Sequence, residues 1–323
     1  MKRSFRVLFL LPLLIPVIDV AAQSSYPDKP IRIIVQTPPG AAPDVLARLI
    51  GQNLSEAWGK PVIVENAPGA AGIVAAEKVA KAAPDGYTLG MPGDAPMTTN
   101  VTLYGKLPYD PLRDFAHITI VAETMNMLVV HPSVPAKNVQ ELIALAKSQP
   151  GKLNYATAGS GTSQHLGGEM LKSMAGVDIL HIPYKSAIQG VQSVLSGEVT
   201  MTFGNVVTTL PHVRDGRLRA LAVTSSKRSL EAPDVPTMAQ SGLPGFEAVA
   251  WFGLVAPAGT PTAILTKWHQ ETLRVLAIPE VRSKIAGLGA VIVGNSSAAF
   301  TAQIKSEIES KGKVIRATGA KPD

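Results

Sequence analysis

A repeated pattern of apolar strand, glycine-bearing loop and helix start limits most strongly how this chain can fold. Residues 31–35 form a nearly continuous apolar run, which is followed by the loop 36–44 and an amphipathic helix. A second unit of the same kind covers 61–82, and a third apolar run covers 87–91, followed by an expected turn-rich loop at 92–96. Runs of this length indicate strands that are buried on both faces of a parallel sheet. Their order predicts the beginning of a doubly wound α/β fold.

The second half of the chain repeats the pattern around the stretch 158–166. Residues 152–157 predict a short strand, and apolar residues at helical spacing predict a helix that ends at Gly176. Between them, two glycines let the backbone approach a ligand, and Ser160, Thr162 and Ser163 supply hydroxyl groups. Backbone amides at the positive end of a helix dipole favour an anion. The stretch therefore predicts a cradle for a carboxylate or a phosphate, although an ordinary strand-to-helix turn has the same composition.

The first 22 residues have the features of a secretory signal peptide. Lys2, Arg3 and Arg6 form a positive region, 7–18 is apolar, and 20–22 is a small-residue cleavage site. The apolar run is short and contains two prolines, which does not favour a membrane span. We expect cleavage near Ala22 and an exported, soluble protein that most resembles a bacterial one.

Composition excludes several classes of function. Loss of 1–22, with three cations and Asp19, lowers the formal net charge from +6 to +4. Lysine and arginine are scattered without a basic run, so we expect no nucleic-acid partner. The absence of cysteine removes disulfides, thiolate metal sites and cysteine nucleophiles. A mature chain of roughly 300 residues exceeds one comfortable hydrophobic core and predicts two domains.

Two similar apolar strands, each followed by a helix, suggest where the chain crosses between domains. They are 127–133 and 251–258, and we interpret them as crossover strands. The predicted division is therefore a signal peptide at 1–22, one domain made of 23–124 plus 251–323, and a second domain at 125–250. Every strand expected in the second domain ends in a small or polar loop, where open α/β sheets bind ligands.

Catalytic motifs are poorly matched. The Gly-x-Ser-x-Gly elbow of serine hydrolases is absent around Ser160, no Gly-Lys-Ser/Thr follows the glycines, and the third glycine of a dinucleotide fingerprint is missing. The six histidines show no metal-ligand spacing, so neither a metal nor a cofactor is expected. We interpret His165 as a helix-start side chain that packs or hydrogen-bonds near the loop. Asp44 is interpreted as a capping carboxylate, and Lys185 is either a ligand contact or a solvated surface lysine.

Many motifs in one order resemble the substrate-binding receptors of tripartite tricarboxylate transporters, the Bug family. The resemblance extends from residue 26 to residue 320 and includes the matching segments 64–66, 68–70, 83–89, 161–166, 182–185, 234–237, 242–245 and 256–261. It implies a periplasmic receptor of the type II, Venus flytrap kind, with two doubly wound domains joined by two crossover strands. Such receptors close on small ligands, usually carboxylates, and deliver them to a membrane transporter.

The resemblance also implies ligand contacts, which are not worked out from spacing. They come from the loops after the first and third strands and from the loops of the second domain. The implied set is Thr37, Pro39, Gly40, Ala41, Asp94, Ala95, Ala158, Ser160, Gly161, Thr162, His165, Tyr184, Lys185 and Gly204.

The chain departs from the family pattern at three places. Ala41 and Ser186 stand where the family usually has glycine, and Gly204 stands where it usually has aspartate. Without that carboxylate a ligand amine loses a partner, so an amino-acid ligand is disfavoured, while a neutral or aromatic ligand stays open.

We therefore predict an extracytoplasmic solute-binding receptor, a monomer and not an enzyme, that hands a small organic acid to transporter membrane subunits. Two alternatives remain at this point. One is an exported hydrolase that uses Ser160 and His165, and the other is a solute sensor for a membrane kinase.

Overall fold

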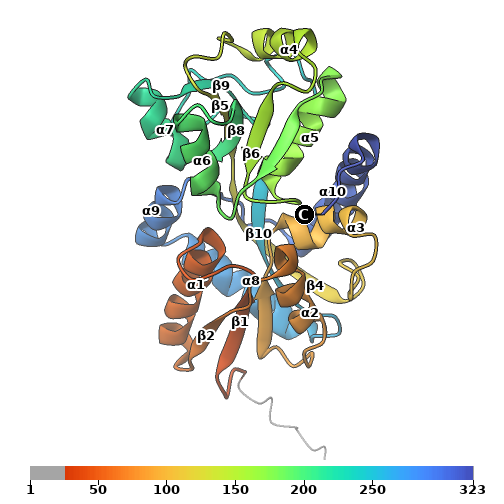
Figure 1. The fold of residues 1–323 in the computed structure, drawn as a ribbon. Helices are drawn as coiled ribbons and strands as arrows, with labels where there is room; N and C mark the ends of the chain where they lie inside the picture. Colours follow the sequence, from red (N-terminus) through yellow and green to blue (C-terminus); the bar gives the residue numbers. More distant parts are fainter. Residues whose placement is uncertain (1–25, 323) are drawn as a thin grey trace, which may run out of the picture.

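A computed structural model describes residues 26–322, so the predicted signal peptide lies outside the described residues. The structure has two α/β lobes stacked end to end (Figure 1). The first lobe contains a six-stranded sheet of order β11-β4-β10-β3-β1-β2, and the second contains a five-stranded sheet of order β7-β6-β8-β5-β9. The fold class predicted from the sequence, two doubly wound α/β lobes, is confirmed.

The first sheet begins with three parallel strands, and its remaining strands are antiparallel to their neighbours. Its strands are β1 (Ile31–Val35), β2 (Val62–Asn66), β3 (Thr88–Met91), β4 (Phe115–Thr124), β10 (Ala250–Pro257) and β11 (Ala290–Ile292). The helical segments of this lobe are α1 (Ala42–Trp58), η1 (Ala70–Gly72), α2 (Ile73–Ala80), the π-helical η2 (Ala95–Thr99), α3 (Asn100–Leu103), α8 (Thr262–Leu276), α9 (Pro279–Gly287) and α10 (Ser297–Thr318).

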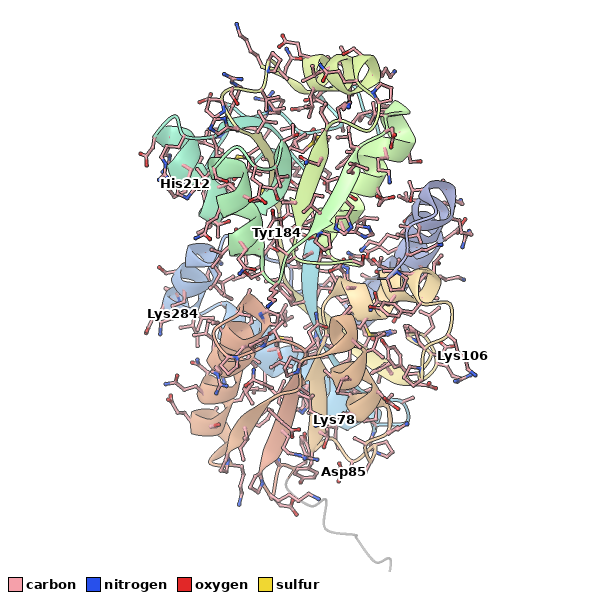
Figure 2. The ribbon with its side chains drawn as sticks, in the orientation of Figure 1. Lys78, Asp85, Lys106, Tyr184, His212 and Lys284 are labelled. Carbon is pink, nitrogen blue, oxygen red and sulfur yellow. The ribbon has the colours of Figure 1, made fainter. Side chains whose placement is uncertain are left out.

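The second sheet places β6 between β7 and β8, and all three run parallel. Its strands are β5 (Asn126–Val130), β6 (Asn154–Thr157), β7 (Leu180–Pro183), β8 (Met201–Asn205) and β9 (Arg219–Val223). The accompanying helices are α4 (Val139–Ser148), α5 (Ser163–Ala175), α6 (Ala187–Leu195) and α7 (Val206–Arg214). Side chains of this lobe and of the first are drawn in Figure 2.

Apolar spacing explains how the helices attach to the sheets. Leu46, Ile50 and Leu54 recur every fourth residue along α1, and all three are buried against the first sheet. The predicted end of α5 is confirmed, because Gly176 adopts a left-handed backbone with φ +61° and closes the helix.

Two chain passages connect the lobes. Only Met125 separates β4 of the first sheet from β5 of the second, and β10 returns the chain to a place beside β4. The C-terminal helix α10 adds a third connection, because it packs against η2 and α3 in the first lobe and against α5 in the second.

The sequence prediction missed the helices α3, α7 and α9. The stretch 92–96, expected to be a turn-rich loop, leads instead into the π-helical segment η2. A π-helical turn is uncommon and is often found at functional sites. None of the helices within residues 26–322 combines the length and the apolar character that a membrane crossing requires.

Candidate functional site

The two sheets bring the predicted site residues to two edges. Thr37 and Asp94 follow β1 and β3, which are neighbours in the first sheet. Ala158, Tyr184 and Gly204 lie at the ends of β6, β7 and β8, which are neighbours in the second sheet. Since the carboxyl ends of parallel neighbours share one edge, each set forms one cluster of loops.

Contacts across the junction join these two edges. In the 158–165 loop, a Cβ placed on Gly161 would lie 2.9 Å from Oδ1 of Asn100, which begins α3 of the other lobe. The Asn100 amide nitrogen donates to the carbonyl of Ala71 at 3.1 Å. A Cβ on the adjacent Gly72 would lie 2.6 Å from Gln36, the residue before Thr37. The loops after β1 and β6 are therefore linked through the 70–72 segment.

The helix that follows β1 neutralises its own N-terminus. The Asp44 carboxylate accepts a hydrogen bond from the Gly40 amide at 2.9 Å and pairs with Arg48. Burial alone would raise the pKa of Asp44, but the bonds from Arg48, Gly40 and Asn66 hold it below its usual value. Asp44 lies in the first turn of α1, as predicted, but the amide that it binds belongs to Gly40 before the helix, and the N-cap Ala41 has no side-chain capping bond. A second anion at this helix end would meet a charge of its own sign.

The helix that follows β6 has no such carboxylate. Its first turn contains no acidic residue, and the Thr162 side chain accepts from the His165 amide as the N-cap. Within residues 26–322 the amides of Thr162, Ser163 and Gln164 have no hydrogen-bond acceptor. Orphan amides at the positive end of a helix are the donors that bind anions. The start of α5 is thus the better anion site of the two.

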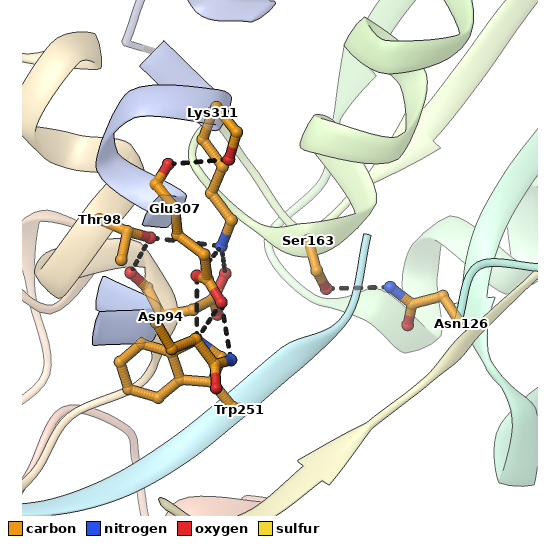
Figure 3. Close-up of polar contacts among 9 residues, drawn as sticks. Asp94, Thr98, Asn126, Ser163, Trp251, Glu307 and Lys311 are labelled. Carbon is orange, nitrogen blue, oxygen red and sulfur yellow. Dashed lines mark hydrogen bonds and ion pairs between the residues drawn. The ribbon is translucent and has the colours of Figure 1, made fainter. Parts of the chain in front are cut away.

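Internal hydrogen bonds hold the α5 loop in shape. The Ala158 amide donates to Oε1 of Gln164 at 2.8 Å, and the Gly161 amide donates to Nδ1 of His165 at 3.2 Å. The interpretation of His165 as a hydrogen-bonding helix-start side chain is confirmed. The side-chain amide nitrogen (Nδ2) of Asn126 donates to the Ser163 hydroxyl at 2.9 Å. This bond ties the start of α5 to the crossover (Figure 3).

The C-terminal segment reaches the same loop. The Ser160 hydroxyl donates to the carbonyl of Lys321 at 3.1 Å, so a hydroxyl that was predicted to bind ligand has a partner in the first lobe. Figure 1 shows the end of the chain beside α3 and the loop into α5. The contact links α10 to the cradle.

Asp94 is also occupied within the protein. Nζ of Lys311 lies 2.8 Å from Oδ2 of Asp94 and 2.8 Å from Oε2 of Glu307 (Figure 3). Lys311 and Asp94 are buried, and Glu307 is partly buried. Trp251 on β10 donates its indole N–H to Glu307 at 3.0 Å. The Asp94 side chain therefore fixes the start of η2 on α10 and neutralises a lysine, which removes its carboxylate from simple ligand recognition.

The remaining predicted residues have mixed surroundings. The Thr37 hydroxyl is buried and has no partner among residues 26–322, and its carbonyl accepts from Asn66 at 2.9 Å. Pro39 and Gly40 are exposed, and Ala41 is the N-cap of α1. Ala95 is the first residue of η2. The Tyr184 amide donates to the carbonyl of Thr157 at 2.9 Å, which places it beside the cradle strand, while Lys185 is exposed.

A large cavity lies elsewhere, and residues of the crossover form part of its wall. Its volume is about 1380 Å³, and its walls include Glu123, Met170 of α5, the 225–231 loop, β11 and Lys311. A smaller cavity of about 620 Å³ borders Tyr184, Lys185 and α6. The large cavity contains no residue of the loops 37–44 or 158–165. Its size alone does not make it the ligand site, because the orphan amides lie in the 158–165 loop.

Sequence reasoning missed Asn100 and Lys311. Asn100 lies in a segment whose helical character was not expected, and the partner of Lys311 is far away in the sequence. Among the described residues 26–322, no group of three or more His, Cys, Asp or Glu side chains could hold a metal ion.

Two α/β lobes whose strand-end loops meet at one junction, with a donor-rich helix start, define a solute-binding receptor of the type II class. The chain belongs to the family described as "Tripartite tricarboxylate transporter family receptor", whose model matches residues 46–320. The resemblance inferred from the sequence is confirmed.

Individual relatives and solved structures support the same family assignment. The chain is 36% identical to Protein BugT of Bordetella pertussis over 320 residues, or 98% of each chain. Its structure is similar to the R. palustris protein Rpa4515 with adipate (TM-score 0.80, 34% identity, 91% of this chain and 98% of that one). It is also similar to MatC from Rhodopseudomonas palustris with bound malate (TM-score 0.78, 31% identity, 90% of this chain and all of that one).

Members of this family are periplasmic solute-binding receptors rather than enzymes. The two alternatives, a hydrolase that uses Ser160 and His165 and a sensor for a membrane kinase, gain no support from these similarities.

Proposed function

We propose that this receptor captures a small carboxylate between its lobes in the periplasm and passes it, as a monomer, to the membrane subunits of a tripartite tricarboxylate-type transporter. The observation that carries the proposal is the start of α5, where three orphan amides meet no acidic side chain. The adipate of Rpa4515 and the malate of MatC are both carboxylates, which supports this class of ligand.

The proposed division of the chain follows from the same arrangement. The signal peptide comprises 1–22 and is cut near Ala22, the first domain comprises 23–124 plus 251–323, and the second domain comprises 125–250. The passage from β4 to β5 and the return at β10 support these limits. Closure about these strands would bring the loops together around the ligand.

The proposed contacts are those of the predicted set. The α5 loop from Ala158 to His165 is the main anion cradle, and Tyr184, Lys185 and Gly204 lie along the same sheet edge. Thr37, Pro39, Gly40, Ala41 and Ala95 supply the opposite side, and Asp94 contributes through its backbone. Charge-assisted hydrogen bonds contribute roughly 1.5–3 kcal/mol each, so four or five of them reach the roughly 8 kcal/mol of micromolar affinity after the cost of closure.

A charge placed in the cradle tests the proposal. Gln164→Glu retains the acceptor for the Ala158 amide and adds a negative charge in the first turn of α5. A carboxylate there favours the helix dipole but repels a bound anion, by about 3 kcal/mol at about 5 Å and an effective dielectric constant of about 20. Calorimetric titration with succinate, adipate, malate and citrate should show roughly 100-fold weaker binding and an unchanged or higher melting temperature.

The matched control is Gln140→Glu, which makes the same change at the equivalent position of α4, outside the proposed site. It should leave the affinity for acids unchanged. If Gln164→Glu binds the acids as tightly as the native protein, the anion does not lie at α5. If no acid in the panel binds to the native protein or raises its melting temperature, the ligand class is wrong.

A further inference from the structure

We propose that the large cavity is a second binding site, which takes a small amphipathic organic cation: a primary ammonium group carried on an apolar body. The cavity has a volume of about 1380 Å³, and its walls include no residue of the loops 37–44 or 158–165. The inference therefore goes beyond the proposed function, because this ligand binds apart from the acid. The volume exceeds the roughly 300–1,000 Å³ of ordinary small-molecule pockets, so a ligand of this class fits.

Much of the cavity wall is apolar. Leu166, Met170 and Met174 recur every fourth residue and line the cavity from one face of α5. Their exposed fractions are 1%, 9% and 37%, so this face leads from the protein interior to the surface. Leu230 and Val291 line the same cavity and are exposed as well, at 97% and 46%. Apolar side chains that gather in one exposed place mark an interaction site, and methionine adapts to ligands of varied shape.

The first sheet adds a carboxylate to this apolar wall. Glu123 on β4 pairs with Val291 of β11 on one side and with Trp251 of β10 on the other. Residues directly opposite each other in antiparallel strands share a face, so Glu123 and Val291 both line the cavity. The indole of Trp251 is bonded to Glu307, which is another wall residue (Figure 3).

Glu123 has no cation of its own. Among residues 26–322 its carboxylate forms neither a hydrogen bond nor an ion pair, whereas Glu307 is paired with Lys311. Burial, followed by the carboxylates of Glu247 and Glu307, raises the pKa of Glu123. The negative charge of Glu123 is therefore poorly compensated within the protein, and a bound ammonium group would compensate it.

Four cations also line the cavity, but none of them forms an ion pair with Glu123: Lys227, Arg228, Arg282 and Lys311. The first three are exposed, so water screens their charges, and the last is neutralised by Asp94 and Glu307. A metal ion is a poorer match, because no group of three or more His, Cys, Asp or Glu side chains in the described part of the chain could hold one. An organic ammonium requires only one carboxylate and an apolar surface, and this cavity has both.

Three probes separate the contribution of charge from that of apolar contact in the native protein. We would titrate hexylammonium, hexanol and methylammonium at pH 8, by calorimetry or ligand-observed NMR. Hexylammonium should bind at least about tenfold more tightly than hexanol, the size expected of one charge-assisted contact. It should exceed methylammonium by about 100-fold or more, because methylammonium lacks the apolar body. Equal affinities within either comparison would overturn the inference.

Variants then assign the charge preference to Glu123. Glu123→Gln keeps the shape of the side chain without its charge, so hexylammonium should bind no more tightly than hexanol. Glu309→Gln makes the same change on the exposed surface of α10, outside the cavity, and should retain the preference. Met174→Gln removes an apolar contact and should weaken both probes by the same few-fold factor, with the preference unchanged. A preference that survives in Glu123→Gln would place the cation elsewhere and overturn the inference.

The outcome is independent of the test of the cradle. If hexylammonium binds at Glu123 while no organic acid binds, this inference stands and the proposed function fails. If acids bind at α5 while hexylammonium shows no preference over hexanol, the proposed function stands and this inference fails.

Discussion

Nζ of Lys311 on α10 lies 2.8 Å from Oδ2 of Asp94, and this ion pair joins the C-terminal helix to the segment that leads into η2. Both side chains are buried, and Thr98 accepts a further bond from the same lysine at 3.2 Å. Burial opposes the charge on Lys311, but the carboxylates of Asp94 and Glu307 raise its pKa above the usual value. The lysine is therefore charged in the folded protein and holds the base of the Asn100 segment in place.

Removal of this lysine should destabilise the fold strongly. Lys311→Met retains much of the side-chain volume but leaves the buried carboxylate of Asp94 and the partly buried carboxylate of Glu307 without their cation. Breaking a buried pair from one side costs about 3–5 kcal/mol. Urea unfolding should show that the free energy of unfolding falls by this amount.

Lys313→Met is the matched control, because Lys313 lies two residues further along α10 in an exposed pair with Glu309. Such pairs contribute between about 0 and 1 kcal/mol. A loss in Lys311→Met no larger than in Lys313→Met would mean that the buried pair of Lys311 and Asp94 does not anchor η2.

Features with near neighbours in the sequence could be predicted. Asp44 bonds an amide four residues before it, and Thr162 caps an amide three residues after it. Apolar runs likewise predicted strands in both sheets, such as 31–35 in the first and 127–133 in the second. These features depend on local backbone geometry, which the residue types reveal directly.

Features that depend on distant partners could not be predicted. Gly93 and Pro96 suggested a turn, but the Tyr109 hydroxyl bonds the carbonyl of Pro96 at 2.8 Å and Lys311 binds Asp94, and together these contacts stabilise a π-helical segment. Nothing local to Asp94 indicates that a lysine on the last helix will occupy its carboxylate. Tertiary contacts here override the local turn preference.

Glu123 on β4 should make stability depend on pH. Burial, followed by the nearby carboxylates of Glu247 and Glu307, raises its pKa above 4.5. Because the folded protein then holds the proton more tightly than the unfolded chain, this group stabilises the fold below pH 4.5, and the benefit is lost as pH rises through the folded-state pKa. Glu123→Gln should therefore be more stable than the native protein at pH 8, and equally stable at pH 4.

At pH 8 the free energy of unfolding of Glu123→Gln should exceed that of the native protein by less than about 1 kcal/mol, because the Glu123 side chain is partly solvated. Urea unfolding at pH 4, 6 and 8 measures it, with Glu309→Gln on exposed α10 surface as the control. A difference between native and Glu123→Gln protein that does not grow with pH would contradict the assignment.

Position 204 is glycine here, where related receptors usually have aspartate. Gly204→Asp as a single change should destabilise the fold. A Cβ at this position would lie 2.5 Å from Cγ2 of Thr209 on α7. Overpacking of this kind costs about 1–3 kcal/mol. Gly204→Asp should unfold at correspondingly lower urea concentration. Thr209→Ser removes only the obstructing methyl and keeps the hydroxyl that bonds the carbonyl of Asn205. The double variant should recover most of the lost free energy of unfolding. If the losses of the two single variants simply add up in the double variant, there is no clash between these two side chains.

Thr162→Ala should weaken both folding and ligand binding, for separate reasons. The hydroxyl accepts from the His165 amide and donates to the Gly159 carbonyl at 2.8 Å, so its removal deletes an N-cap that contributes about 1 kcal/mol to stability. The same change loosens the cradle and should lower affinity for a bound acid several-fold. Thr162→Ser retains the hydroxyl and should restore both properties. Paired urea and calorimetric measurements separate the effects: a Thr162→Ala protein that loses stability but binds acids normally would show that the cap shapes α5 without contributing to the ligand site.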